Sequence, residues 1–130
     1  GIDRAPAEGL PIHFSCFMDD PMVVTLAEQK HITRAEVAIE QSLSIAGPKL
    51  IVIGSAPMAL NRLLQLHKNA PLHEVVIIGA ATGFANIVEL KERLWESGLP
   101  CVVARGRKGG PVPAIAIVNA LLQEAAAQRA

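Results

Sequence analysis

Aromatic residues, and an excess of charge of either sign, are what this 130-residue chain lacks. It has no tyrosine, three phenylalanines and one tryptophan, which excludes a platform of aromatic rings for stacking single-stranded nucleic acid. Twelve basic and twelve acidic residues cancel, whereas a dedicated nucleic-acid or membrane-surface binder usually carries a strong basic excess. We therefore expect neither nucleic acid nor a membrane as a partner.

Cysteines and long apolar runs are also scarce. Cys16 and Cys101 each sit in an apolar stretch that predicts a strand, so we interpret both as small core hydrophobes rather than as a disulfide framework. No apolar run reaches the roughly 18 residues that a membrane span needs, and no signal-peptide pattern opens the chain. These features predict a soluble protein of the reducing cytoplasm.

The four histidines show no pattern that identifies a catalytic base or a metal site. No pair of them has metal-ligand spacing, no cysteine pair accompanies them, and no Ser/His/Asp order stands out. Surface placement is expected for His67, late in a predicted helix, and for His73, beside a loop. The other two histidines are His13 and His31.

The chain is long enough for one domain, and its 51% hydrophobic content supplies a core. The first eleven residues, rich in Pro, Gly and Ala, predict an irregular arm. After the arm, short apolar strands alternate with helices. Strands are expected at 12–18, 50–53, 74–78 and 100–104, and helices at 22–30, 34–46, 57–67, 85–96 and 113–128.

Continuously apolar strands are buried on both faces, which is typical of a parallel sheet covered by helices. We therefore predict a single α/β domain over 1–130. It is a three-layer, Rossmann-like fold with a mostly parallel sheet of about four strands flanked by helices.

Ligands of such sheets bind beyond the carboxyl ends of the strands. Three of those ends are rich in glycine and other small residues, and each leads into a helix N-terminus, where anions are favoured. Tight strand–helix turns need glycine in any case, so each loop has a purely structural explanation as well. Three such loops together favour a binding surface. Its candidate residues are Gly54, Ser55, Ala56, Pro57, Gly79, Thr82, Gly83 and Phe84, and the third loop follows below.

The third loop is basic. Arg105, Arg107 and Lys108 place three positive charges beside Gly106, Gly109 and Gly110, which predicts a clamp for carboxylates or phosphates. A solvated basic loop is the alternative. The order differs from a P-loop, because the lysine precedes the glycines and no Ser or Thr follows them, so nucleotide binding is not favoured.

These loops, in this order, resemble a known family. V-I-G-S-A-P-M-A-L at 52–60 resembles V-I-G-N-A-P-T-A-L, and I-G-A-A-T-G-F at 78–84 with E-L-K-E at 89–92 is similar to G-x-P-V-G-F-V-x-A-x-E-S-K-E. V-A-R-G-R-K-G-G at 103–110, followed by A-I-V-N-A-L at 116–121, resembles V-R-G-R-K-G-G with its A-x-x-N-A-L helix, and I-T-R-A at 32–35 resembles T-R-S/A. The family is precorrin-8X methylmutase, also called precorrin isomerase or cobalt-precorrin-8 methylmutase.

The resemblance implies an isomerase of cobalamin biosynthesis that moves a methyl group between adjacent carbons of the corrin macrocycle. The implied reaction gives hydrogenobyrinate or cobyrinate, without a cofactor or a metal. The resemblance further implies a homodimer with the active site near the subunit interface. The substrate is a flat apolar ring with a rim of carboxylates, which Arg34 and the basic loop would meet.

The family's catalytic histidine is expected in an N-terminal segment ahead of the region that this chain covers, so no catalytic residue is assigned here. Ser55 and Met58 replace the family's Asn and Thr, and Ala81 and Thr82 replace its Pro-Val. Three hypotheses stay open. The chain is part of a methylmutase and inactive alone, or a shortened homologue that binds a corrinoid or another polycarboxylate without catalysis, or a Rossmann-like interaction module.

Overall fold

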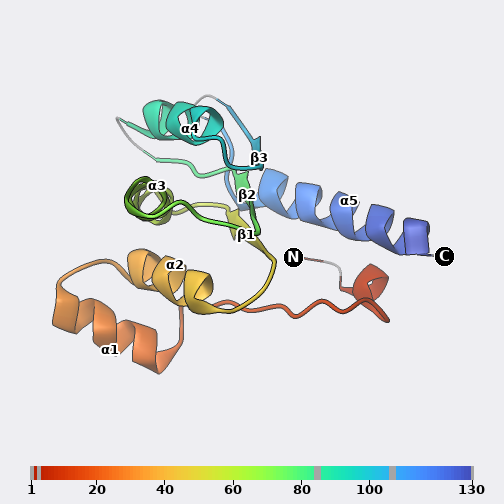
Figure 1. Cartoon of the computed structure of the whole chain (residues 1–130), viewed down its shortest axis with the longest axis horizontal. Coiled ribbons are helices and arrows are strands. Elements are labelled where there is room, and N and C mark those ends of the chain that lie inside the picture. Colours follow the sequence, from red (N-terminus) through yellow and green to blue (C-terminus); the bar gives the residue numbers. More distant parts are fainter. Residues whose placement is uncertain (1, 3, 84–85, 106–107, 130) are drawn as a thin grey trace.

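The computed structural model describes residues 2, 4–83, 86–105 and 108–129. Helices and strands alternate along most of the chain (Figure 1). The elements are η1 (Ala5–Ala7), α1 (Pro21–Lys30), α2 (Arg34–Ser44), β1 (Lys49–Ile53), α3 (Pro57–Asn69), β2 (Val75–Gly79), α4 (Ile87–Glu96), β3 (Cys101–Val103) and α5 (Pro111–Arg129).

The strands form a parallel sheet of three, in the order β1-β2-β3. Lys49 pairs with Val75 at one end of the register and Ile53 with Gly79 at the other, and β3 pairs Cys101 with Ile77. All three strands therefore end at the same edge of the sheet. The α/β class and the parallel sheet are confirmed, with three strands in the described part of the chain instead of about four.

Helices cover both faces of the sheet, which makes three layers (Figure 1). On one face, Ile51, Ile53 and Ile77 pack with residues of α2, α3 and α4 in the larger core. On the other, Ile78 and Ala80 pack against Ala114, Val118 and Leu122 of α5. The two helices that connect the parallel strands, α3 and α4, lie on the same face, and α5 covers the other.

The first two long helices begin where side chains cap their free N–H groups. The carboxylate of Asp20 accepts from the Met22 N–H at 2.9 Å, with Pro21 at the first position of α1. At α2, Thr33 Oγ1 accepts from the Glu36 N–H, and Glu36 Oε1 accepts from the Thr33 N–H, both at 3.2 Å. This reciprocal capping box fixes the start of α2 at Arg34, where the helix is predicted to begin.

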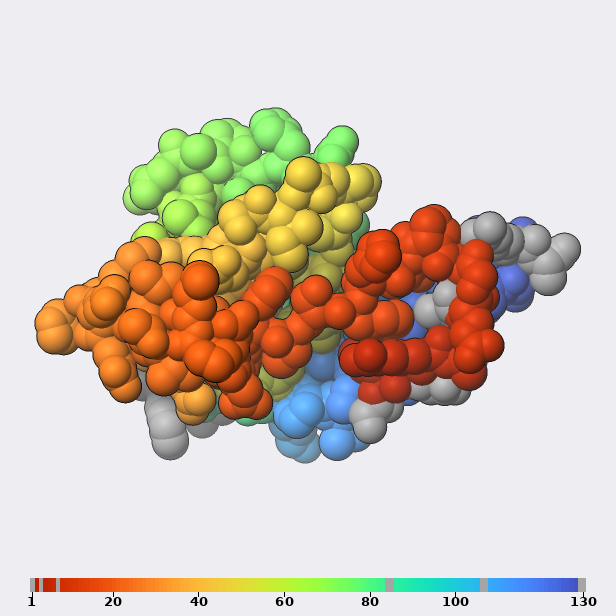
Figure 2. All heavy atoms as spheres, turned by 90° about the horizontal axis from the view of Figure 1, so that it is seen from below, coloured from red at the N-terminus to blue at the C-terminus, as the bar shows by residue number. Residues whose placement is uncertain are grey.

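The strand predicted at 12–18 is wrong. That segment pairs with no strand of the described sheet, and it continues the N-terminal arm across the surface between α1 and α5 (Figure 2). Aromatic anchors hold it instead: Phe14 packs against the α5 side of the core, and Phe17 against α1 and α2. Arg4 also lies 4.7 Å from the centroid of the Phe14 ring.

The two cysteines differ in environment because one lies on a strand of the sheet and the other on the unpaired segment 12–18. Cys101 is half-buried on β3 and packs against the larger core, and this burial raises the pKa of its thiol. Cys16 lies on this unpaired segment and is exposed, so its interpretation as a core residue is wrong. Without a neighbouring strand, the Cys16 side chain is left open to solvent.

The boundaries of the other elements differ from the predicted ones by at most two residues, as helix ends commonly do. Helix α2 ends at Ser44 rather than 46, and α3 extends to Asn69 rather than 67. Helix α5 begins at Pro111 rather than 113, because Gly110 with φ 103° turns the chain directly into it. Within the described residues, no helix combines the length and apolar composition that a membrane crossing requires.

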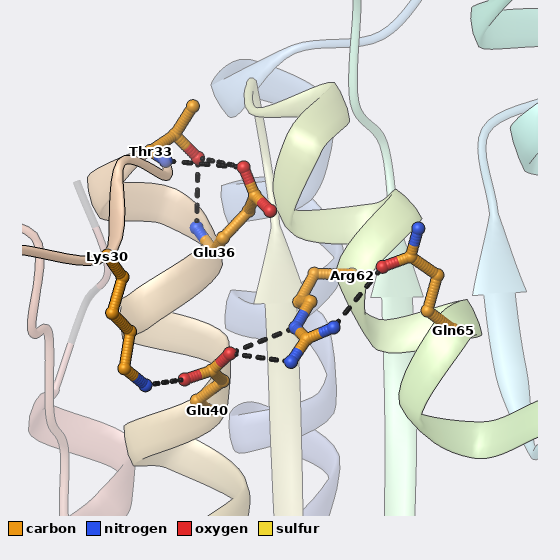
Figure 3. A network of polar contacts seen from close by, with 6 residues as sticks. All are labelled: Lys30, Thr33, Glu36, Glu40, Arg62 and Gln65. Atoms are coloured by element: carbon orange, nitrogen blue, oxygen red, sulfur yellow. Dashed lines mark hydrogen bonds and ion pairs between the residues drawn. The ribbon is translucent and has the colours of Figure 1, made fainter. Parts of the chain in front are cut away.

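A network of ions joins the first three long helices (Figure 3). Glu40 on α2 accepts from Arg62 Nε of α3 at 2.9 Å and from Lys30 Nζ at the end of α1 at 3.1 Å. Partial burial by itself raises the pKa of Glu40, but the bonds from Lys30 and Arg62 outweigh it and hold that pKa below its usual value of 4.5. The network ties α1 and α3 to α2 on the outer side of the larger core.

The first prediction concerns this network. Replacing the carboxylate in Glu40→Gln should lower the free energy of unfolding at pH 7 by about 1–2 kcal/mol, since the ion pairs with Lys30 and Arg62 are lost. Because the native pKa lies below that of the unfolded chain, the contribution is present above about pH 4.5 and is lost as the pH falls through the native value. Urea unfolding between pH 7 and pH 3 should therefore show a shallower acid limb in the variant. Glu28→Gln, at an exposed position of α1, is the control. An equal acid limb in wild type and Glu40→Gln would contradict the prediction.

The second prediction concerns the contact between β2 and α4. A Cβ built at Gly79 would lie 2.6 Å from Cδ2 of the buried Leu94. Gly79→Ala should therefore destabilise the protein by about 1–3 kcal/mol through overpacking. In the Leu94→Ala background the collision is absent, so the second substitution should cost less there. Unfolding of the four proteins by urea measures this coupling, and strictly additive losses would refute the packing explanation.

Candidate functional site

The three loops predicted as a binding surface converge at the carboxyl edge of the sheet. Gly54, after β1, lies so close to α5 that an added Cβ would be 3.2 Å from Pro111 Cα. A Cβ at Gly110 would lie 3.9 Å from the Gly54 carbonyl oxygen and 3.8 Å from Cγ2 of Thr82, which follows β2. Sites that are more than 50 residues apart in sequence thus form one surface, which supports the sequence prediction of their grouping.

Close packing explains most of the glycines in these loops. A Cβ at Gly83 would lie 2.5 Å from Cγ of Pro57, and one at Gly109 would collide with the carbonyl oxygen of Ala80. Gly79 is held close to Leu94 in the same way. At these positions the structural explanation is sufficient, because no side chain fits between the elements that the loops join.

Exposure divides the candidate residues. Ser55, Gly83, Arg105 and Lys108 are exposed, whereas Gly79 and Gly110 are buried. The half-buried group is Gly54, Ala56, Pro57, Thr82 and Gly109. Phe84, Gly106 and Arg107 lie outside the described residues. Of the basic residues predicted in the third loop, Arg105 and Lys108 can therefore be placed.

Arg105 is held by α4. Its Nε and Nη2 donate to the two carboxylate oxygens of Glu92 at 2.8 Å each, and its guanidinium lies 5.5 Å from the centroid of the Trp95 ring. The hydrogen bond from Arg105 holds the pKa of Glu92 below its usual range, and Glu92 in turn raises the pKa of Arg105. Because this bond is bidentate, it fixes the orientation of the guanidinium as well as its position.

Lys91 is the residue of this region that sequence reasoning missed. Its side chain is fully buried, and its Nζ donates to the carbonyl oxygen of Lys108 at 2.9 Å. Burial lowers the pKa of Lys91. Helical spacing carried the signal: Lys91 follows Ile87 by four residues and precedes Leu94 by three, which puts it on the apolar face of α4.

Arg34 lies apart from these loops in its contacts. Its Nη1 is 3.5 Å from the Met18 carbonyl oxygen and 3.7 Å from a carboxylate oxygen of Asp19, both just ahead of α1. Among the polar contacts of the described residues, none joins Arg34 to the three loops. The sequence predicted that Arg34 groups with the three loops, and the polar contacts of Arg34 within the described residues do not join it to them.

Two helices that begin at the carboxyl edge have no side-chain cap. Neither Ala56 before α3 nor Asn86 before α4 caps its helix through a side chain, in contrast to Asp20 and Thr33 at α1 and α2. Free N–H groups at a helix start favour a negative charge. The backbone N–H groups at this edge of the sheet therefore favour anions, as do its basic side chains.

His67 has a structural role, and its expected surface placement is wrong. Its Nδ1 accepts from the Leu72 N–H at 3.1 Å, so its Nε2 carries the proton and donates to the Ser97 carbonyl oxygen at 3.2 Å. The half-buried ring thereby links the end of α3 to the end of α4. In the described part of the chain, no group of three or more His, Cys, Asp or Glu residues is placed to hold a metal ion.

Comparison with known proteins supports the resemblance. The chain is 42% identical over 111 residues to the cobalt-precorrin-8 methylmutase of Salmonella typhimurium, covering 82% of this chain and 50% of that protein. It is 37% identical over 123 residues to the precorrin-8X methylmutase of Pseudomonas aeruginosa, covering 93% of this chain and 58% of that protein. The chain thus spans about half the length of the curated relatives it matches.

Solved structures agree. A precorrin-8X methylmutase related protein superposes with a TM-score of 0.84 at 27% identity, over 95% of this chain and 64% of that one. The precorrin-8X methylmutase of Thermus thermophilus superposes with a TM-score of 0.81 at 28% identity, over 98% of this chain and 62% of that one. The sequence model described as precorrin-8X methylmutase matches residues 1–124. With nearly its whole length matched in sequence and in fold, the chain belongs to the precorrin-8X methylmutase family.

Proposed function

We propose that this chain supplies the substrate-binding part of a precorrin-8X methylmutase, an isomerase of cobalamin biosynthesis that moves a methyl group between adjacent carbons of the corrin ring. The observation that carries the proposal is the convergence of the three strand-end loops at one edge, in a chain that the family model matches over residues 1–124. Such a role goes with the cytoplasmic location expected from the sequence.

The chemistry of the edge suits a flat ring with a rim of carboxylates. Lys108 offers an exposed ammonium, and the uncapped starts of α3 and α4 offer N–H groups to anions. Ser55, Ala56 and Gly83 are small, which leaves the edge open to a bulky apolar ring. The proposed site residues are those of the three loops, with Lys108 as the cation that meets the rim.

Catalysis is a separate part of the proposal. The proposed roles of the described loops are to bind and orient the carboxylates, and none of His13, His31, His67 or His73 takes the family's catalytic place. We therefore propose that the chain alone binds a corrin acid and does not turn precorrin-8X over. The alternative, a corrinoid-binding homologue without catalysis, rests on the departures from the family pattern at Ser55 and Met58.

The third prediction tests binding. Hydrogenobyrinic acid, titrated with the chain and followed by its visible absorption, should bind saturably and more weakly as salt is raised. Lys108→Gln should weaken binding about 3- to 10-fold, since one exposed charge-assisted bond is worth on the order of 1 kcal/mol. Lys68→Gln, at the far end of α3, is the matched control and should change nothing. If wild type does not bind, or both variants bind equally, the proposed site is wrong.

We further propose that two copies of the chain associate. Leu50, Val52, Val76 and Val102 lie on the sheet face that α5 covers only in part, and each is 38% to 43% exposed. Four apolar side chains side by side on a sheet form a patch that a protein partner covers well. A second copy is the proposed partner, in line with the homodimer that the family resemblance implies.

The fourth prediction follows from this patch. Light scattering at micromolar concentration should give the mass of a dimer, and Val76→Lys should shift it to that of a monomer. Val112→Lys, on the exposed side of α5, should leave the dimer intact. A wild-type monomer, or a dimer that survives Val76→Lys, would count against pairing through this face.

A further inference from the structure

We propose that Lys91 and Glu92, neighbours on α4, are positioning residues that hold the two described ends of the basic loop, Arg105 and residues 108–110, in place for anion binding. The identity of the anion rests on the proposed function. The clamp itself rests on contacts within the described residues, and these can be tested without any ligand.

Glu92 holds the first end of the loop. Both oxygens of its carboxylate accept from the Arg105 guanidinium at 2.8 Å, and the neighbouring Trp95 ring lies under the same guanidinium. Just before it, the Ala104 N–H donates to the Gly79 carbonyl oxygen at 2.9 Å, which continues the β-ladder. The chain therefore leaves the sheet in a fixed direction at Arg105.

Lys91 holds the second end. Its Nζ donates to the Lys108 carbonyl oxygen, and a Cβ at Gly109 would lie only 3.2 Å from the same nitrogen. The Gly110 N–H then donates to the Ala80 carbonyl oxygen at 2.6 Å, and Pro111 begins α5. The ammonium thus sits at the point where the loop rejoins the fold.

The burial of this amine needs a reason, because a lysine is almost never fully buried unless its charge is satisfied. A residue on the apolar face of α4, between Ile87 and Leu94, would pack more simply as leucine or methionine. What only the ammonium supplies there is a donor to the backbone of the loop. The Lys108 carbonyl is one partner of that donor, and this bond ties the core to the proposed binding surface.

The contacts of Glu92 with Arg105 and of Lys91 with the Lys108 carbonyl give the two described cations of the loop different roles. Arg105 is engaged by Glu92, so its charge serves the shape of the loop. Lys108 uses its carbonyl for the clamp, while its side chain is exposed and available to an anion. Arg105 therefore acts on a ligand through the loop, and Lys108 acts directly.

The fifth prediction tests the lysine. In Lys91→Met, amide hydrogen exchange at Gly110 should speed up at least 10-fold more than in Leu63→Ala, a core variant of α3 that reports general destabilisation. Affinity for hydrogenobyrinic acid should fall about 10-fold in Lys91→Met and less than 2-fold in Leu63→Ala. Exchange at Gly110 that rises no more than in Leu63→Ala overturns the clamp. Faster exchange with unchanged affinity overturns its role in binding.

A double-mutant cycle tests the contact of Glu92 with Arg105. This test can be made even if Lys91→Met does not fold. If Glu92 acts only by holding Arg105, then Glu92→Gln, Arg105→Gln and the double variant should lose the same affinity, about 3-fold. A larger loss in Arg105→Gln than in Glu92→Gln shows that Arg105 touches the ligand, which overturns the positioning role. Failure of wild type to bind hydrogenobyrinic acid rejects the proposed function, and exchange at Ala104 and Gly110 still decides the clamp.

Discussion

The burial of β2 on both faces is the constraint on which the rest of this structure depends. Ile77 and Ile78 are neighbours that point to opposite sides of the sheet, and both are completely buried. Two helical layers are needed to bury both, so α3 and α4 occupy one side and α5 the other (Figure 1). Because β1 and β3 pair with β2 in parallel, all three strand ends, and the loops that follow them, meet at one edge.

That edge is built tightly from backbone, and its chemistry follows from this. A Cβ added at 79, 83 or 109 would collide with a neighbouring element, and one at 54 would lie 3.2 Å from Pro111 Cα. Few side chains are left to bind a ligand, so the basic loop carries most of the charge. A loop of this kind is useful only if it is held, and the ion pair of Glu92 with Arg105 and the buried ammonium of Lys91 hold it at both ends.

Prediction from sequence succeeded where the signal was local. The helix start at 34, the helix end at 96 and the apolar strands 50–53 and 74–78 each depend on neighbouring residues, and each lies within one residue of its predicted place. It failed for 12–18, because an apolar run shows that a segment is extended but not whether another strand has an edge free to pair with it. It failed for His67 as well, since the partners of that ring come from loops 5 and 30 residues away.

The sequence by itself determined the α/β alternation, the three glycine-rich strand ends and the family resemblance, because these rest on periodicity, turn chemistry and short motifs. The tertiary structure decided which charges are free. Arg34, Arg105 and Lys108 are all exposed cations, yet their contacts differ. Arg34 contacts the segment just before α1, Arg105 is engaged by Glu92, and Lys108 accepts from Lys91 through its backbone carbonyl. It also decided that Lys91 belongs to the loop 14 or more residues further along the chain. The energy of a charge depends on its surroundings in three dimensions, and those are set only when distant segments pack together.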